Sequence, residues 1–211
     1  IQPGIVVEGE SFNFGSGRTG SVHTLQKLGA EKGFEVSVID SKEVKLSTGQ
    51  TVKISSTMIR NLIGSGGVAD AAIALGRPYR LAGKVIPGCG KGKQLGFPTA
   101  NMKPLPQIIP AEGVYAGFVQ MGDSFESVCT SKQKFPAAFS IGRSETFGSD
   151  NPQAIEAHIL AGSVEDLSSK WLAMDFIKHI RSQMKFDSEK ELSAQIAKDC
   201  EKAKKILTKE G

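Results

Sequence analysis

The first part of the chain alternates between strand-like and helix-like spacing of its hydrophobic positions. Residues 5–7 and 34–39 are short apolar runs, and residues 22–32 between them carry apolar side chains at helical intervals. Buried strands on either side of an amphipathic helix are typical of a β-α-β unit. This region therefore predicts an α/β fold.

Two short helices are predicted next, separated by the glycine-rich run at residues 64–67. The Ser55-Ser56-Thr57 run can cap a helix over residues 58–63. Residues 68–75 predict another helix, closed by Gly76. The glycine-rich run also predicts the point at which the chain divides.

From Arg77 onward the spacing becomes strand-like, with runs punctuated by Gly, Pro and Asn. Short strands of this kind favour an antiparallel barrel. The expected strands cover residues 79–86, 114–121, 125–130, 137–141 and 155–160. Two helices are expected after them, the second opening with Ser188 and Glu191 as a capping box. That helix should pack on the barrel through one apolar face, formed by Leu192, Ile196, Cys200, Ala203 and Leu207.

Composition narrows the class of protein. The 211 residues are 39% hydrophobic and 23% charged, which suits one core or two small ones, and no long apolar span occurs. We therefore expect a soluble protein without membrane contact. Residues 1–7 lack both an initiator Met and the pattern of a signal peptide, so we expect an interior fragment.

Charge and cysteines add two further expectations. Cys89, Cys129 and Cys200 are far apart and show no metal-like spacing with the three histidines, which favours a reduced cytosolic compartment and no zinc site. The net charge of +4 is spread along the chain, so polyanionic small molecules suit it as well as nucleic acid does.

The strongest chemical signal is the loop Gly90-Lys91-Gly92-Lys93-Gln94-Leu95-Gly96-Phe97-Pro98-Thr99-Ala100-Asn101. Glycines allow close backbone approach, lysines supply positive charge, and Thr and Asn offer the neutral oxygens that Mg²⁺ accepts. The loop therefore predicts a polyphosphate and metal site. It is not a P-loop, because Phe97 and Pro98 follow its last glycine where Lys and Ser/Thr would be required.

This loop belongs to an ordered set of segments that resembles the riboflavin kinase module of bacterial bifunctional riboflavin kinase/FAD synthetases. The matching segments are residues 76–85, 90–101, 112–116, 140–143, 146–148, 155–158, 180–181 with 185–186, and 192–203. Upstream, residues 12–15 with Arg18 and Gly20, and residues 55–60, resemble the closing half of the FMN adenylyltransferase module of the same family.

The resemblance implies a fold and a reaction. It implies an α+β chain in which a six-stranded antiparallel Greek-key barrel with C-terminal helices follows a partial α/β, Rossmann-like nucleotidyltransferase domain. The implied domains are an incomplete adenylyltransferase part at 1–65, a linker helix at 66–76 and a riboflavin kinase domain at 77–211. The implied reaction is the phosphorylation of the riboflavin 5′-hydroxyl by ATP with Mg²⁺ to give FMN, in the cytoplasm, by a monomer or weak homo-oligomer with small-molecule partners.

The resemblance also implies roles for residues of the kinase module. Thr99 and Asn101 match the family's PTAN motif at Mg²⁺ and phosphate, and Pro98 fixes the entry angle of that motif. The flap over the nucleotide is matched by Gly90, Lys91, Gly92, Lys93 and Gly96.

Glu156 matches the catalytic carboxylate of the family. Strand alternation turns it away from the face that carries Ile155, Ala157 and Ile159, so it can serve as general base beside the transferred phosphate. The alternative is a solvated Glu on an outer face.

Arg181, Lys185 and Phe186 match the segment that the family places around the flavin ring, the alternative for Arg181 being an exposed helix charge. The chain departs from the family here, since Gln183 stands where a Glu is usual. Residues 161–166 also replace the usual Asp-rich turn.

The upstream part lacks the family's nucleotide motif with two histidines flanked by glycines, and Ser11 replaces a usual Asp. Ser55, Ser56 and Arg60 match only a phosphate-binding remnant at a helix N-terminus. We therefore expect no adenylylation of FMN by residues 1–211.

Two other functions are compatible with parts of the pattern. Gly15, Gly17 and Gly20 fit G-x-G-x-x-G, with Asp40 at the end of the second strand, which would suit a dinucleotide (NAD)-binding module. However, residues 9–14 intervene between the first strand and these glycines. A barrel that binds single-stranded nucleic acid would need stacking aromatics, and the chain has one Trp and two Tyr.

Overall fold

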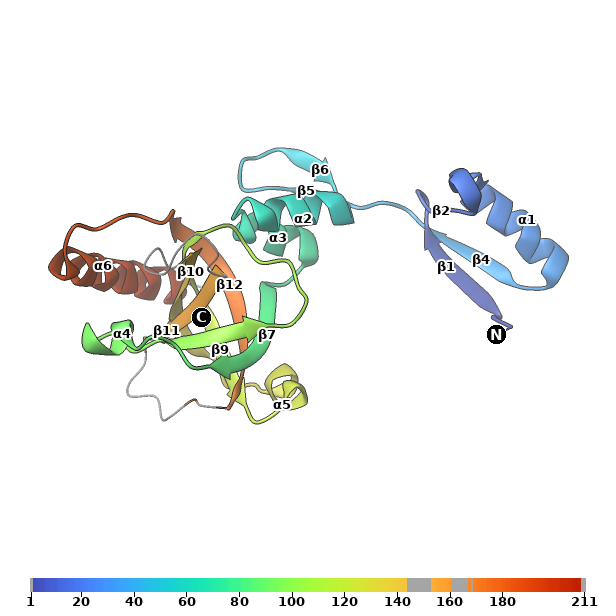
Figure 1. Ribbon diagram of the computed structural model, residues 1–211. Coiled ribbons are helices and arrows are strands. Elements are labelled where there is room, and N and C mark those ends of the chain that lie inside the picture. The colour runs from blue at the N-terminus through green and yellow to red at the C-terminus, as the bar shows by residue number, and fades with distance from the viewer. Residues whose placement is uncertain (1, 144–152, 161–166, 168, 210–211) are drawn as a thin grey trace. The chain divides into compact units, whose positions relative to one another are not determined.

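The computed structural model describes residues 2–143, 153–160, 167 and 169–209. These residues form two compact units. The first contains the chain up to Lys45 together with Gly49–Ile54, and the second contains Leu46–Thr48 and the chain from Ser55 onward (Figure 1). The matched segment at residues 146–148 and the altered turn at residues 161–166 lie outside the described residues.

The first unit contains the predicted β-α-β arrangement. Strands β1 (Ile5–Gly9) and β4 (Glu35–Ile39) pair in parallel, and α1 (Val22–Lys32) connects them. Ser21 caps α1 by accepting a hydrogen bond from the Thr24 amide, and Gly33 ends it in the left-handed conformation. The smaller elements of this unit are β2 (Asn13–Phe14), the 3₁₀ turn η1 (Ser16–Arg18), β3 (Gly20–Ser21), β5 (Glu43–Lys45) and β6 (Thr51–Lys53).

The second unit begins with the two predicted helices. Helix α2 (Ser56–Gly64) starts at Ser55, whose hydroxyl accepts a hydrogen bond from the Met58 amide, and α3 (Val68–Leu75) ends at Gly76. Helix α2 was expected in the first domain, but it packs on α3 within the second unit. The functional boundaries at 65 and 76 remain a prediction.

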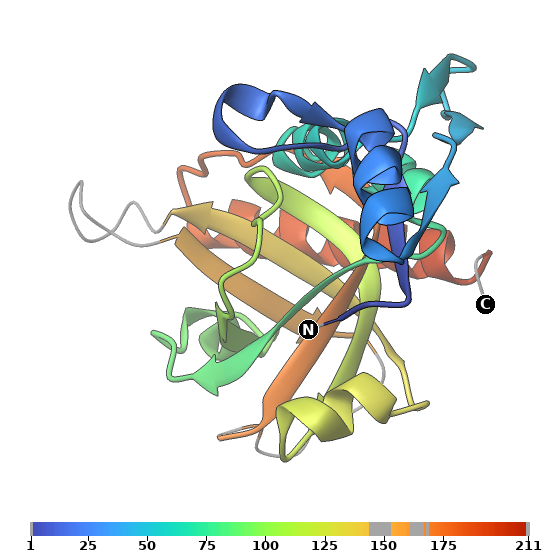
Figure 2. The same ribbon diagram turned by 90° about the vertical axis from the view of Figure 1, so that its right-hand side faces the viewer.

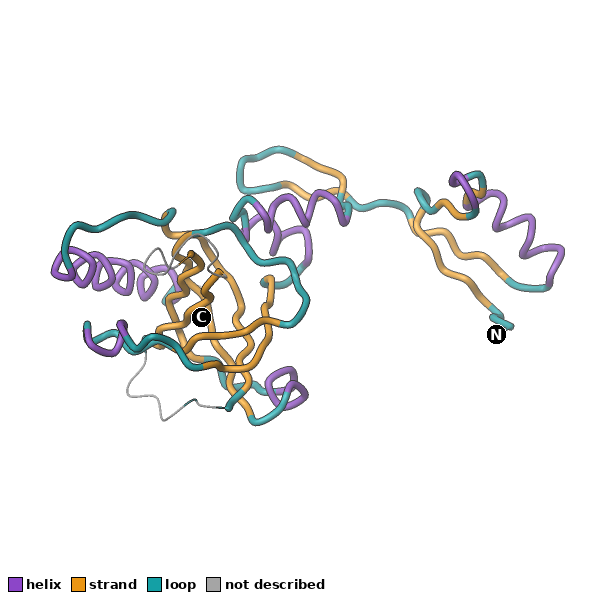
Figure 3. Tube along the Cα trace, viewed as in Figure 1, coloured by secondary structure: helices purple, strands orange, loops and turns teal. Residues whose placement is uncertain are grey.

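Six antiparallel strands close into the barrel that the family resemblance implied (Figure 3). Around the barrel the strands run β10-β11-β8-β7-β12-β9, and β9 and β10 complete the ring. Strands β9, β10 and β11 follow one another directly, and β12 returns beside β9, which is a Greek key. The strands are β7 (Tyr79–Ile86), β8 (Ala100–Pro104), β9 (Gly113–Gly122), β10 (Phe135–Arg143), β11 (Gln153–Ile159) and β12 (Trp171–Arg181).

Alternate side chains of these strands fill the barrel interior. Leu81, Tyr115, Phe139, Ile155 and Phe176 are all buried there at 1% exposure or less. Because side chains alternate along a strand, the residues between them project outward, where helices cover some and others remain open. The candidate site lies on this outer side.

Three expectations for the barrel region were wrong. Residues 125–130 form the helix α5 (Phe125–Thr130) instead of a strand, because Ser124 and Ser127 cap each other's backbone amides at its start. Strand β8 was missed; it begins at the last two residues of the candidate loop. The first of the two expected C-terminal helices is strand β12, whose apolar run is buried on both faces and so lacks the alternation that marks a strand.

The remaining C-terminal helix is α6 (Glu189–Leu207), which lies along one side of the barrel, while α5 covers another (Figure 2). Four of the five residues of the predicted apolar face are confirmed: Cys200, Ala203 and Leu207 pack against Val114 and Ile180, with Ile196 partly buried beside them. The capping box forms only in part. Ser188 accepts from the Glu191 amide, but the Glu191 carboxylate accepts from the amide of Asp187 instead of Ser188.

Candidate active site

The loop between β7 and β8 folds back on itself. Its central residues form the short helix α4 (Lys91–Gln94), which places the exposed Lys91 and Lys93 on one helical turn (Figure 3). Gly90 and Gly96 flank this turn with φ of 74° and 84°, in the left-handed region that favours glycine.

The two limbs of the loop touch at Gly92. The Phe97 amide donates to the Gly92 carbonyl at 2.8 Å. A Cβ on Gly92 would lie 2.6 Å from the Phe97 carbonyl oxygen and 3.1 Å from Thr99 Oγ1. The loop can close this tightly only because residue 92 has no side chain, and Thr99 is thereby held under the turn that carries the lysines.

The end of the loop is tied to β11 by His158. Its Nδ1 lies 2.8 Å from the Pro98 carbonyl oxygen, and since a carbonyl only accepts, Nδ1 carries the proton. The Phe97 ring meets the His158 ring edge-on, with 5.6 Å between centroids. Pro98 and Phe97 are therefore fixed against the strand that carries Glu156, two residues from His158.

Glu156 and Asn101 meet across the β8–β11 pair. They are register partners, and the Asn101 amide hydrogen-bonds the Glu156 carboxylate. Burial raises the pKa of the Glu156 carboxyl above its ordinary value, and the hydrogen bond from Asn101 opposes that shift. Glu156 is therefore not the solvated outer-face residue of the alternative interpretation, although it does point away from Ile155 and Ala157 as predicted.

The first limb of the loop passes directly over this pair. A Cβ on Gly88 would lie 2.0 Å from Asn101 Nδ2, so only glycine permits the approach. The structure thus brings together residues that were predicted from separate parts of the sequence: Asn101 at the end of the loop, two residues after Thr99, and Glu156 on β11.

The oxygen donors of this group suit a hard divalent cation. Thr99 offers a hydroxyl, Asn101 an amide oxygen and Glu156 a carboxylate, which are the ligand types that Mg²⁺ prefers. Within the described residues, no group of three or more His, Cys, Asp or Glu side chains gathers in a way that could hold a metal. A cation here would need further oxygens from water or phosphate.

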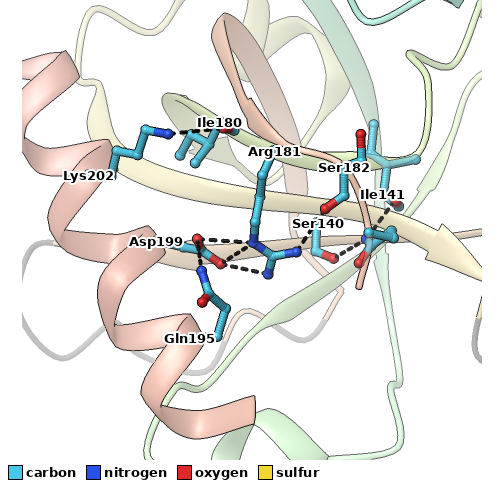
Figure 4. Close-up of polar contacts among 9 residues, drawn as sticks. Ser140, Ile141, Ile180, Arg181, Ser182, Gln195, Asp199 and Lys202 are labelled. Carbon is cyan, nitrogen blue, oxygen red and sulfur yellow. Dashed lines mark hydrogen bonds and ion pairs between the residues drawn. The ribbon is translucent and has the colours of Figure 1, made fainter. Parts of the chain in front are cut away.

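Arg181 lies at the end of β12 and is engaged with α6 (Figure 4). Its Nε and Nη2 donate to the Asp199 carboxylate, with Nη2 to Oδ2 at 2.7 Å, and Nη1 donates to the Ser182 carbonyl at 2.9 Å. Its side chain is 17% exposed and that of Asp199 is 7% exposed. Arg181 is therefore a largely buried strand residue, and the alternative of an exposed helix charge is wrong.

The flavin-segment residues lie close by. The Phe186 ring centre is 5.9 Å from Arg181 Cζ, in cation–π contact, while Lys185 is exposed. Gln195 donates to Asp199, and Lys202 donates to the Ile180 carbonyl, so α6 holds the end of β12 at several points (Figure 4).

The family model described as Flavokinase, riboflavin kinase, matches residues 75–207 of this chain. The match covers the barrel, the loop with α4, and α6. The chain belongs to the riboflavin kinase family.

Relatives of this riboflavin kinase family member are named for two activities, riboflavin kinase and FMN adenylyltransferase. The bifunctional riboflavin kinase/FMN adenylyltransferase of Escherichia coli (strain K12) is 35% identical over 191 residues, which cover 90% of this chain and 56% of that protein. The protein of that name from Haemophilus influenzae is 34% identical, covering 93% and 59%. The chain thus spans less than two thirds of the length of these relatives.

A solved structure is also similar. A protein titled macrolide-efflux protein from Streptococcus pneumoniae superposes with a TM-score of 0.76 at 30% identity, covering 95% of this chain and 60% of that one. Across the described part of this chain, no helix combines the length and the apolar character that crossing a membrane requires. The comparisons give no support to the dinucleotide-binding or nucleic-acid-binding alternatives.

The upstream candidate residues lie on α2 of this family member. Ser55 uses its hydroxyl to cap the helix, while Ser56 and Arg60 are exposed. An open hollow of about 470 Å³ lies beside the N-terminal turns of α2, lined by Ser55, Thr57, Met58, Asn61, Leu62 and Ser65. Gly15 precedes η1, Gly17 lies within it, and Gly20 begins β3, where it packs against the Phe14 ring.

Sequence reasoning named no role for three residues that the structure places around Glu156. His158 shares the outward face of β11 with Glu156, which strand alternation could have shown. Ser140 is the register partner of Glu156 on β10, and Gln183 donates to Ser140. These two contacts depend on strand pairing and on the path of the chain after β12, which no local pattern reports.

Proposed function

We propose that this chain transfers the γ-phosphoryl group of ATP to the 5′-hydroxyl of riboflavin, giving FMN and ADP. One observation carries the proposal: Glu156 is paired and hydrogen-bonded with Asn101, against which Gly88 of the β7–β8 loop packs. Phosphoryl transfer requires an in-line nucleophile, a proton acceptor and charge neutralisation, and these residues offer all three in one place. Membership of the riboflavin kinase family supports the assignment of the flavin substrate.

Glu156 acts as the general base. Its carboxylate accepts the proton of the riboflavin 5′-hydroxyl, the hydroxyl oxygen bonds to the γ-phosphorus, and the bond from that phosphorus to the bridging oxygen of ADP breaks. Burial raises the pKa of Glu156, so the carboxylate binds the proton more strongly than an exposed Glu would. The hydrogen bond from Asn101 orients the carboxylate and opposes the rise in its pKa.

The loop binds the nucleotide. Lys91 and Lys93 on α4 face solvent and can close on the phosphates, while Gly90, Gly92 and Gly96 let backbone amides approach them. His158 holds Pro98, so Thr99 has a fixed position at the edge of the loop.

We infer that Thr99 and Asn101 hold Mg²⁺ together with the phosphates, because their oxygens match its ligand preference and Asn101 is the register partner of Glu156. When bound, the cation neutralises charge on the phosphate oxygens. Arg181, held by Asp199, supports the segment 182–186, and Lys185 and Phe186 of this segment contact the flavin.

Three unpaired cysteines support a reduced, cytoplasmic setting, and we expect a monomer or weak homo-oligomer that uses small-molecule substrates.

The test is a pair of assays on purified residues 1–211. With riboflavin, ATP and Mg²⁺, we expect FMN to accumulate in a chromatographic assay. With FMN and ATP, we expect no FAD, because the upstream part lacks the two-histidine nucleotide motif. Absence of FMN formation would refute the kinase proposal, and FAD formation would refute the expected incompleteness of the upstream site.

A further inference from the structure

Gln183 ties the segment that follows β12 to strand β10. Its Nε2 donates to the Ile141 carbonyl at 2.8 Å and to Ser140 Oγ at 3.1 Å. The amide lies so close to Gly142 that a Cβ there would come within 2.8 Å of Nε2. Residue 183 is otherwise exposed, so the amide group makes this contact, and the aliphatic part of the side chain is not buried by it.

Gln183 contacts the β10–β11 strand pair, which carries the proposed base Glu156. Ser140 on β10 is the register partner of Glu156 on β11, and Glu156 is the partner of Asn101 on β8. Directly opposed residues of an antiparallel pair project to the same face, with Cβ atoms about 5 Å apart. Ser140, Glu156 and Asn101 therefore form one row across the outer face of the barrel, and Gln183 joins its end.

Arg181 holds the start of the same segment, residues 182–186, at Ser182. The ion pair with Asp199 fixes the guanidinium to α6, and the bond from Nη1 to the Ser182 carbonyl fixes the first residue after β12 (Figure 4). The segment 182–186 is thus held at Ser182 by Arg181, and one residue later Gln183 binds it to β10. Beyond that second point, Met184 is 53% exposed.

We propose that Gln183 is a positioning residue for riboflavin: its amide holds residues 182–186 against the β10–β11 face that carries Glu156, so that this segment forms a wall of the riboflavin site. The inference rests on the proposed kinase function. It assigns Arg181 to the support of that wall through Asp199, and leaves flavin contact to Lys185 and Phe186.

The chemistry of the contact selects an amide at this position. The Ile141 carbonyl can only accept, so its partner must donate, and a carboxylate at residue 183 would have no proton to give at neutral pH. Glu, the usual residue of the family at this position, has nearly the same shape as Gln but would repel the carbonyl oxygen, so this contact is a feature of this chain's own Gln183. Gln183→Glu therefore isolates the loss of the hydrogen bond from any loss of volume.

The experiment measures KM and kcat for both substrates in wild type, Gln183→Ala and Gln183→Glu, and riboflavin affinity by fluorescence titration. Gln183→Ala should raise KM and Kd for riboflavin roughly tenfold, since it loses both hydrogen bonds that order the segment. Gln183→Glu should raise them in the same direction, since it loses the bond to the Ile141 carbonyl and can only accept from the Ser140 hydroxyl. KM for ATP should stay within about twofold, because the nucleotide loop is untouched.

Two matched controls complete the set. Gln26→Ala and Gln26→Glu make the same changes at an exposed position of α1 and should leave all constants at wild-type values. Ser140→Ala removes one of the two bonds, so its effect on riboflavin KM should be smaller. The double variant Ser140→Ala/Gln183→Ala should have nearly the same riboflavin KM as Gln183→Ala, because Gln183→Ala has already lost the bond to Ser140.

The outcomes separate the two proposals. If wild type forms FMN but Gln183→Ala and Gln183→Glu keep the wild-type riboflavin KM and Kd, the positioning role is wrong and the kinase function stands. An equal rise in KM for ATP and riboflavin would also overturn it, since that indicates a general structural defect. If wild type forms no FMN at all, the proposed function fails first.

Discussion

At the scale of single residues, Glu156 shows how neighbours determine what a side chain can do. Its strand neighbours Ile155 and Ala157 point into the barrel core, whereas Glu156 is half-buried on the outer face beside Asn101. Partial burial disfavours the ionised carboxylate, which is why its pKa rises, and the bond from Asn101 limits the rise. A base needs both effects, because it must be ionised before the reaction and protonated after it.

Glu156→Gln should lower kcat by roughly 10²- to 10⁴-fold, the usual contribution of a general base, while KM for ATP changes little. Steady-state kinetics with riboflavin and ATP measure both constants. Near-normal FMN production by this variant would remove Glu156 from the mechanism.

The stability of the same variant provides its control. For a carboxyl whose folded-state pKa is raised, the folded protein holds the proton more tightly than the unfolded chain. The free energy of unfolding therefore falls as pH rises from the ordinary Glu pKa through the raised one. At neutral pH, Glu156→Gln removes this cost, so its thermal midpoint should equal or exceed that of wild type. A lower midpoint would show that lost activity reflects damage to the fold.

The pH dependence of the wild-type rate follows from the same shift. Glu156 must be ionised to accept the proton, so kcat/KM should rise with pH through a pKa above the ordinary carboxyl value. The pH–rate profile measures this acidic limb, and Glu156→Gln should abolish it. A limb that persists unchanged in the variant would belong to another group.

At the scale of elements, the loop between β7 and β8 works because its limbs touch. Gly92 sits against the Phe97 carbonyl and Gly88 sits against Asn101, so the turn that carries Lys91 is closed over β8. Any side chain at residue 92 must push backbone apart, since its Cβ would lie 2.6 Å from that carbonyl oxygen.

Gly92→Ala should therefore weaken ATP binding by about 1–3 kcal/mol, the usual cost of forcing a methyl group into a filled space. The measurement is KM for ATP beside KM for riboflavin, and the second should change less. Gly64→Ala is the matched control, because a Cβ there meets nothing within 4 Å. Equal behaviour of the two variants would mean that the closed loop is not needed for nucleotide binding.

At the scale of the whole molecule, the two compact units differ in how much core they contain. The largest fully buried side chains, such as Tyr115, Phe139 and Phe176, all lie in the second unit, at Ile63 or beyond. In the first unit, Ile5 and Val7 on β1 are each 59% exposed. Buried apolar area is the main source of folding free energy, so the barrel should be much the more stable unit.

Native-state hydrogen exchange tests this difference. Amides of β1, α1 and β4 should exchange by local opening, well before those of β9, β10 and β12, whose protection should approach that of global unfolding. Mass spectrometry of peptic peptides resolves the two sets. Equal protection in both would show that the units unfold together.

Local sequence patterns predicted some elements of this protein correctly and others incorrectly, for physical reasons. Local spacing was enough for α1, α2, α3 and α6, because a helix is defined by contacts within a few residues, and the glycine and lysine loop was recognised by its composition. Strand β12 and helix α5 were misassigned, since a doubly buried run has no alternation and a six-residue helix has too little period.

What the sequence by itself determined is the family and the chemical character of the loop, Thr99, Asn101 and Glu156. The tertiary structure alone decided which of these groups meet: Glu156 with Asn101, His158 with Pro98, Arg181 with Asp199, and Gln183 with Ser140. These pairs are separated by 18 to 60 positions in the chain. Local side-chain patterns specify nearest neighbours, whereas only strand register and helix packing bring such distant groups within hydrogen-bond reach.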